Sequence, residues 1–406
     1  MQESHVGEPP QDPPYGWLVV GTLAVTVTVS YGVLTYAFGI VLVPMQRELG
    51  WSRIELAGAF SLALAVWAVA GVPVGMALDR YSPRILLTGG SALGAGLVLA
   101  WSQVHSRLEL YLVFAGLGVA MATLLYNAVF AVATKWFRAR RREALTTITL
   151  VGAFSSFIFS PLTGTLTAEL GWRGALMVLA VILAAVGIAL HAAVLRPAPP
   201  ATKEDAVTPA RDQVHAALTS RRFWFLAIAL ALGSYTWSAM LVQLVPFLID
   251  AGDGIKFGAL AAGVVGIGQL PGRLVYVIFG RALRGAKLPV ATFGLAVGAL
   301  ALLTIDRSEA TVLVFALVFG MSAGMLTLMS ASLPAELFGR HVYGTLSGVI
   351  YGCSNGARAA APFASAAIAL LPGGYATLFG SLMLASVVAA TLGFLALRGE
   401  ASVEAT

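Results

Sequence analysis

Long apolar runs alternate with short polar interruptions along the whole chain. A run of about 18 or more apolar residues is long enough to cross a bilayer as a helix. The runs predict twelve membrane spans, and the polar, proline-rich stretch 196–220 divides them into two sets of six. The predicted spans lie near residues 15–45, 52–78, 84–104, 108–136, 142–168, 172–195, 221–249, 256–280, 287–304, 309–337, 342–371 and 374–397.

The two sets of spans repeat one another in sequence. The segment "LVFAGLGVAMATL" at 112–124 is similar to "LVFGMSAGMLTLM" at 317–329. Parallel repeats of six spans predict two helical bundles that face each other across a central cavity. We therefore expect the following organisation: a tail 1–14, a first bundle 15–195, a linker 196–220, a second bundle 221–397 and a tail 398–406.

Composition agrees with an all-α membrane protein. Hydrophobic residues make up 58% of the 406 residues and charged residues only 11%, whereas about a quarter of the residues of a soluble domain are charged. No segment shows the alternation of a membrane β-barrel. The single Cys353 excludes a disulfide framework and a cysteine-based metal site. We predict neither a metal nor a cofactor.

The distribution of basic residues predicts the orientation of the spans. Seventeen of the 25 Lys and Arg residues fall in loops and tails on one side of the twelve-span map, and six fall on the other. Cytoplasmic loops carry such an excess. Both termini and the linker are therefore expected in the cytoplasm, and the short loops suit a prokaryotic inner membrane. Topology also explains the net charge of +6 better than nucleic-acid binding does.

Two arginines lie well inside predicted spans, Arg273 in the eighth and Arg358 in the eleventh. Each costs roughly 2.5–3.5 kcal/mol on insertion scales at the centre of a membrane helix. None of the 19 acidic residues lies at their depth. Arg273 is roughly 12 Å from Arg281 by the rise of a helix, which is close to mid-bilayer. Because a guanidinium matches a carboxylate bidentately, the missing partner is expected to be a carboxylate cargo.

Polar and aromatic residues on neighbouring spans complete the predicted binding site. Packing between helices is the alternative explanation for each aromatic residue. The candidates are Tyr31, Tyr36, Tyr126, Asn127, Tyr235, Gln269 and Asn355.

A loop after the second predicted span carries a family motif. The segment "GMALDRYSPR" at 75–84 resembles the Gly-x-x-x-Asp-Arg-x-x-x-Arg motif of the major facilitator superfamily. The resemblance covers Gly75, Asp79, Arg80 and Arg84. It implies the twelve-helix fold and alternating access. A carboxylate at a helix end facing basic residues forms a breakable latch, and Asp79 is expected to pair with Arg138 or Arg140.

Two further segments resemble monocarboxylate transporters within this superfamily. "DPPYGW" at 12–17 is similar to the signature that opens their first helix, and it keeps Asp12, Gly16 and Trp17. "WFRARRREALTTITLVG" at 136–152 is similar to their loop and fifth-helix signature. The resemblance implies a transporter of small organic anions such as lactate, pyruvate, formate or oxalate.

The eighth predicted span differs from that family in one position. Monocarboxylate transporters carry an Asp-x-x-x-Arg pair there, and this chain has Gln269-x-x-x-Arg273. The related oxalate–formate exchangers have basic residues in the eighth and eleventh helices, which resembles Arg273 and Arg358. Glutamine does not titrate, and the five histidines lie near span ends or in loops. We therefore expect anion exchange or a proton carried by the substrate, with proton-coupled symport as the alternative.

Other functional classes fit the sequence less well. A membrane sensor or scaffold would be supported by a long appended domain. A membrane enzyme needs a nucleophile, a base or metal ligands at one depth, and one cysteine with peripheral histidines does not supply them. The latch motif argues against a channel. A small carboxylate and the lipid bilayer are the expected partners, and no nucleic acid is expected.

Overall fold

The computed structural model of the chain describes residues 13–137, 140–196, 211–279, 285–338 and 343–398. Within these ranges all regular secondary structure is helical, and no strand occurs. The first half holds α1 (Tyr15–Tyr31), the π-helical segment η1 (Gly32–Tyr36), α2 (Ala37–Leu49), α3 (Arg53–Arg80), α4 (Pro83–Trp101), α5 (Arg107–Leu124), α6 (Tyr126–Thr134), α7 (Arg141–Gly152), α8 (Phe154–Leu183), the π-helical segment η2 (Ala184–Ile188) and α9 (Ala189–Val194). The second half holds α10 (Arg211–Thr219), α11 (Arg221–Asp250), α12 (Ile255–Phe279), α13 (Lys287–Ile305), α14 (Glu309–Phe338), α15 (Tyr343–Ile368) and α16 (Tyr375–Leu397).

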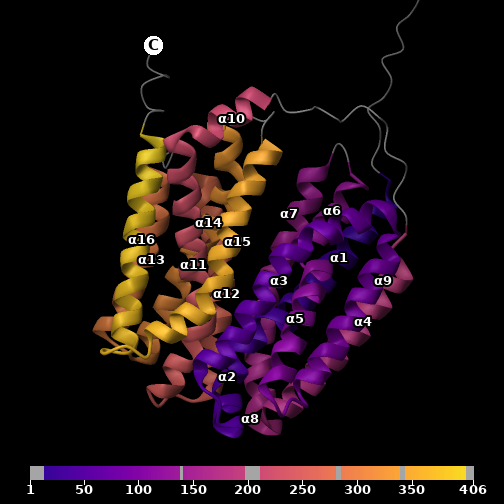
Figure 1. Ribbon diagram of the computed structural model, residues 1–406, viewed down its shortest axis with the longest axis vertical. Helices are drawn as coiled ribbons and strands as arrows, with labels where there is room; N and C mark the ends of the chain where they lie inside the picture. The colour runs from indigo at the N-terminus through magenta and orange to yellow at the C-terminus, as the bar shows by residue number, and fades with distance from the viewer. Residues whose placement is uncertain (1–12, 138–139, 197–210, 280–284, 339–342, 399–406) are drawn as a thin grey trace, which may run out of the picture.

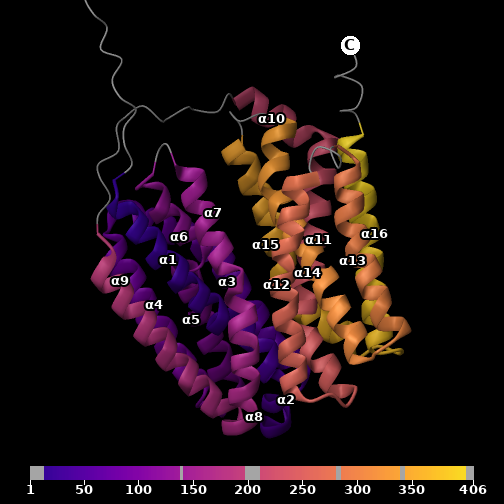
Figure 2. The same ribbon diagram turned by 180° about the vertical axis from the view of Figure 1, so that it is seen from behind.

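The helices form two groups that lie side by side (Figure 1). We call the end of the molecule that carries α10 the linker end, and the end that carries α2 the far end. The two groups diverge toward the linker end and approach each other at the far end, and the view from behind shows the same arrangement (Figure 2). The described hydrogen bonds between the groups include one from the Phe363 amide of α15 to Ser61 Oγ of α3 and one from Arg273 of α12 to the Thr149 carbonyl of α7.

Each half has an aromatic core of its own. In the first half the Phe38 and Phe60 rings stack at 4.4 Å, and the Trp101 and Phe114 rings meet edge to face at 4.9 Å. In the second half Phe247 packs edge to face against Phe379, also at 4.9 Å. Such pairs add specific attraction to the burial of apolar area. Each half thus has its own aromatic cluster, and Val242 of α11 packs into the core of the first half.

Ten helical segments among the described residues are long and apolar enough to cross a membrane. One of them runs over Glu143–Val194 and turns sharply at Gly171, whose φ of 71° and ψ of 170° are accessible almost only to glycine. The turn falls between the predicted spans 142–168 and 172–195. α15, which is 26 residues long, is not one of the ten described segments.

Several predicted spans are interrupted, and part of the predicted linker is helical. The fourth predicted span is interrupted at Leu125, whose extended backbone (φ −92°, ψ −178°) separates α5 from α6. The first span contains the π-helical turn η1 at Gly32–Tyr36. The linker contains α10. π-turns occur often at functional sites, and the interruptions at η1 and Leu125 lie next to the predicted site tyrosines Tyr31, Tyr36 and Tyr126.

Candidate functional site

Arg273 on α12 reaches across to the other half of the molecule. Its Nη1 donates to the carbonyl oxygen of Thr149 on α7 at 3.0 Å, and its Nη2 lies 3.5 Å from Oε1 of Gln269, one turn earlier on α12. Its Nε is buried and has no hydrogen-bond partner. The guanidinium therefore retains donor capacity that the surrounding protein does not use.

Arg358 on α15 is held in a similar state. Its Nε is also buried without a partner, and its backbone carbonyl accepts a hydrogen bond from Ser238 Oγ of α11 at 3.0 Å. Neither arginine takes part in any of the six ion pairs that the described residues form. Buried charges are normally paired, so two half-buried guanidiniums without carboxylates are chemically able to accept an anion.

Tyr36 brings the two arginines into one site. Its phenol lies close to the side chains of Gln269 and Ser156, and Arg273 and Arg358 are both near enough to act on it electrostatically. Tyr36 is the last residue of η1, so the π-turn sets the direction of this side chain. A phenol hydroxyl and two guanidiniums together can donate several hydrogen bonds to one carboxylate.

Two more tyrosines extend the cluster on the side of the first half. The rings of Tyr31 and Tyr126 lie 4.8 Å apart, and those of Tyr31 and Tyr36 lie 6.4 Å apart. Tyr31 is in the field of Arg358, and Tyr126 is in the field of Arg273. The structure thus gathers six of the nine predicted binding residues, which we call the arginine site: Tyr31, Tyr36, Tyr126, Gln269, Arg273 and Arg358.

The other three predicted binding residues have different surroundings. Asn127 is exposed and lies opposite Gly71 of α3. Tyr235 is half-buried and packs against the aromatic core of the second half. Asn355 is half-buried on α15, one turn before Arg358. None of these three has a described bond to the arginine site.

Sequence reasoning did not identify Ser156. The residue lies on α8, is 1% exposed and contacts Tyr36. Serine is common in membrane helices, where it usually serves helix packing. The sequence feature that could have identified Ser156 is the series of hydroxyl residues to which it belongs, spaced along one face of α8.

Interlocking glycines fix the helix that carries Arg273. A Cβ added at Gly320 of α14 would overlap the carbonyl oxygen of Val265, and one at Gly324 would overlap that of Gln269. A Cβ at Gly272 would overlap the carbonyl oxygen of Met321 in the opposite direction. α12 and α14 therefore pack backbone to backbone on both sides of Gln269, as small residues allow in membrane helices. This contact holds Gln269 and Arg273 at a defined depth and rotation.

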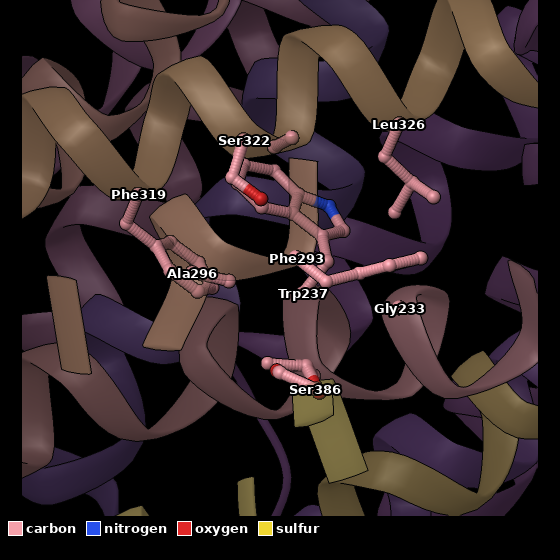
Figure 3. A pocket seen from close by; sticks show the side chains of 10 residues that line it. Gly233, Trp237, Phe293, Ala296, Phe319, Ser322, Leu326 and Ser386 are labelled. Atoms are coloured by element: carbon pink, nitrogen blue, oxygen red, sulfur yellow. The ribbon is translucent and has the colours of Figure 1, made fainter. Parts of the chain in front are cut away.

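A small cavity elsewhere in the second half is a poor candidate site (Figure 3). It lies among α11, α13, α14 and α16, and its lining includes Trp237, Phe293, Phe319 and Ser322. Its volume is about 10 Å³, which is no more than one water molecule needs. No charged residue lines it, so it offers nothing that would select an ion.

The sequence matches the profile of the Major Facilitator Superfamily over residues 23–362. The chain belongs to this superfamily. Monocarboxylate transporter 13 of Rattus norvegicus is 30% identical to it over 340 residues, which cover 82% of this chain and 78% of that protein. Monocarboxylate transporter 11 of Mus musculus is 31% identical over 279 residues, which cover 65% and 59%. The resemblance found in the sequence is thereby confirmed, as is the expectation that a transporter rather than an enzyme is encoded.

Solved structures of similar fold also belong to transporters. A bacterial homologue of the human lysosomal transporter Spinster, in an inward-facing and unoccupied conformation, superposes with a TM-score of 0.75 at 16% identity over 96% of this chain and 98% of that one. The nucleoside transporter NupG superposes with a TM-score of 0.74 at 12% identity over 94% and 99%. At these identities the likeness shows the superfamily fold alone.

The loop motif of this superfamily member makes an ion pair different from the expected one. Asp79 pairs with Lys135 Nζ at 2.9 Å, and the same ammonium donates to the carbonyl oxygen of Leu78 at 2.8 Å. Arg140 pairs with Glu143 and lies over the Trp17 ring at 4.7 Å. The expected pairing of Asp79 with Arg140 is therefore corrected to Lys135, which is nearer to the end of α6.

The remaining motif residues lie around this pair or outside the described chain. Arg80 and Arg84 are exposed, and Gly75 has open space beside it. Arg138 lies outside the described residues. The Asp79–Lys135 pair joins α3 to α6 within the first half.

Charged residues at the far end form a second set of ties, which the sequence did not predict. Arg53 Nη1 of α3 lies 2.8 Å from Oδ2 of Asp250 at the end of α11, and it also donates to the hydroxyl of Tyr375. Lys256 of α12 pairs with Glu169 of α8 at 3.3 Å. Both pairs connect the two halves. They link the two halves at the far end, where the two groups of helices approach each other (Figure 1).

Proposed function

We propose that the protein is an alternating-access secondary transporter of small carboxylates, which Arg273 and Arg358 bind. The observation that carries the proposal is the pair of half-buried guanidiniums that share Tyr36 and form no ion pair with a described carboxylate. A carboxylate cargo supplies the missing negative charge. The names of two relatives, monocarboxylate transporters 13 and 11, support this class of cargo.

The proposed architecture has twelve membrane spans in two six-helix repeats. It follows if the segment Glu143–Val194 counts as two spans, separated at Gly171, and if α15 crosses the membrane despite its lower apolarity. The protein lies in the inner membrane of a prokaryotic cell. Its two termini and its linker face the cytoplasm, as the excess of basic residues on that side indicates. In that orientation the far end faces outward, and the ties at Arg53 and Lys256 close the outer side.

The proposed coupling is anion exchange or transport of a proton on the substrate itself. Gln269 replaces the acidic residue of the Asp-x-x-x-Arg pattern, and a glutamine carries no titratable proton. An empty site with two positive charges resists reorientation, while a bound carboxylate neutralises part of that charge. The loaded protein therefore reorients more readily than the empty one, and this difference produces exchange. Proton-coupled symport is the competing mechanism.

The deciding experiment is uptake of radiolabelled carboxylates into proteoliposomes that contain the purified full-length protein. The panel is lactate, pyruvate, formate and oxalate, each with and without unlabelled carboxylate inside and with and without a pH gradient. Uptake that needs internal carboxylate and ignores the gradient supports exchange. Uptake into empty vesicles driven by external acid favours symport, and no uptake of any carboxylate removes the cargo assignment. Arg273→Gln is the matched variant, and it must abolish whatever uptake is found.

A further inference from the structure

Four hydroxyl residues lie in a row on α8, which we call the hydroxyl stripe: Ser156, Ser160, Thr163 and Thr167. Spacings of four, three and four residues put them on one face of the helix. Their exposed fractions are 1%, 0%, 0% and 6%. None of the four hydroxyl oxygens has a hydrogen-bond partner.

This state is unusual for a helix hydroxyl in this protein. Several buried hydroxyls elsewhere bond to the carbonyl oxygen four residues earlier, as Thr28 does at 2.7 Å, Thr292 at 2.9 Å and Ser386 at 2.8 Å. The described residues include eight buried hydroxyls without a partner, and half of them belong to the stripe. Leaving a buried hydroxyl without a hydrogen bond is costly. A second conformation of the protein, in which all four hydroxyls form hydrogen bonds, would explain why they lie together.

The stripe faces the seam between the two halves. On one side of it, Ser155 Oγ donates to the Thr28 carbonyl, and Phe159 packs on Gly32 of η1. On the other side, Gly164 packs against Ala259 of α12. Helical spacing of 100° per residue puts the stripe between these two faces of α8. It therefore lies where the first span of one half meets α12 of the other.

The stripe also connects two features already described. Ser156 contacts Tyr36 of the arginine site and lies directly against Gly266 of α12. Beyond Thr167, Glu169 of α8 forms the pair with Lys256 that ties the halves at the far end. Three turns of α8 thus lead from the anion site to the closed end.

We propose that the hydroxyl stripe is the polar wall of the outer half of the cargo route, and that it meets water and carboxylate when the far end opens. Hydroxyls donate to carboxylate oxygens without holding them by charge, which suits a route better than a binding site. The proposal rests on alternating access as proposed above. In the state described here α12 covers the stripe, and separation of α12 from α8 uncovers it.

The test uses cysteine accessibility in the full-length protein. Cys353→Ser removes the single native thiol, and Ser160→Cys, Thr163→Cys and Thr167→Cys are then made one at a time. Each variant is placed in nanodiscs, which expose both faces, and treated with an anionic, water-soluble methanethiosulfonate. Arg53→Gln is added in a parallel series to release the far end. The matched control is Ser155→Cys, because Ser155 is equally buried on α8 but bonded to Thr28 and turned away from the seam.

We expect the three stripe cysteines to react roughly tenfold or more faster than the control once Arg53→Gln is present, since labelling of a buried thiol follows the population of the open state. Thr167→Cys should react fastest and Ser160→Cys slowest. Equal, slow labelling at all four positions overturns the proposal. Labelling is read as a mass change and needs no cargo, so a failure of carboxylate uptake is distinguishable from a failure of the stripe.

A second variant covers the case in which a cysteine disturbs folding. Thr163→Val keeps the shape and removes the hydroxyl. If the stripe lines the route, the valine favours the closed state, because that state no longer buries an unsatisfied hydroxyl at this position. Uptake then slows roughly fivefold or more. If Thr163 serves packing alone, uptake keeps its rate, and the proposal fails.

Discussion

Arg273 of the second half donates from Nη1 to the carbonyl oxygen of Thr149 in the first half at 3.0 Å. The same nitrogen is a natural donor to a carboxylate. A carboxylate bound at Arg273, as proposed above, would share this guanidinium with the Thr149 carbonyl. Because this bond joins α12 to α7, the proposed anion-binding residue is also a contact between the two halves.

Arg273→Lys should lower carboxylate uptake by about 10- to 100-fold, since an ammonium keeps the charge but loses the planar fork that serves Gln269, Thr149 and cargo together. Initial uptake rates in proteoliposomes measure the effect. Arg307→Lys, at the far end over the Phe247 ring, is the matched control and should transport normally. Unchanged uptake with Arg273→Lys would rule out bidentate binding at this position.

Arg53→Gln should favour opening of the far end, because it removes the pair with Asp250 and the bond to Tyr375. The expected shift is about 1 kcal/mol, as for a partly exposed ion pair. Spin labels at Leu170 and Leu370, both exposed, report the distance across that end in the Cys353→Ser background. Arg107→Gln breaks the pair with Glu55, which lies within one half, and should leave the distance unaltered.

Asp79→Asn should reduce the transport rate while it changes stability by less than about 1 kcal/mol, because the Asp79 and Lys135 side chains are 74% and 40% exposed. The charge-swapped double variant Asp79→Lys with Lys135→Asp tests the pair itself. Partial recovery of uptake supports a latch role. Equal loss in the single and double variants shows that only the aspartate position matters.

Gly320→Ala should destabilise the protein by roughly 1–3 kcal/mol, since the added methyl group overlaps the Val265 carbonyl and forces α12 and α14 apart. Thermal unfolding in detergent should show a clear drop in midpoint. Gly298→Ala on α13 is the matched control, because open space surrounds that position. It should be neutral or stabilising by up to about 1 kcal/mol.

Asp306 predicts a pH dependence of stability. Hydrogen bonds from Ser308 and Thr311 lower the pKa of its carboxyl group to about 2, below the ordinary value of about 3.9. A lowered folded-state pKa stabilises the fold above the unfolded value, and the contribution is lost as pH falls toward the folded value. Asp306→Asn should therefore lower the thermal midpoint by the same amount at pH 7 and pH 5, and by less at pH 3. A difference that grows on acidification would contradict this assignment.

Hydropathy alone predicted much of the fold, because lipid selects apolar residues in every span and each helix satisfies its own backbone. The turn at Gly171 falls where the sequence predicted a boundary, and the depth of Arg273 and Arg358 follows from counting residues along a helix. The arginines could also be singled out, since a charge inside an apolar run is costly wherever its helix packs.

The contacts between helices could not be predicted from the sequence and were decided by the tertiary structure. Six of the predicted residues meet at the arginine site, whereas Asn127, Tyr235 and Asn355 have no described bond to it. Asp79 meets Lys135 rather than Arg140 because the end of α6 brings that lysine closer. Arg53 and Asp250 are 197 positions apart in the sequence. In the sequence alone, each is an ordinary charged residue near the end of a predicted span. Only the approach of the two halves at the far end makes them a pair, and the same approach buries the hydroxyl stripe.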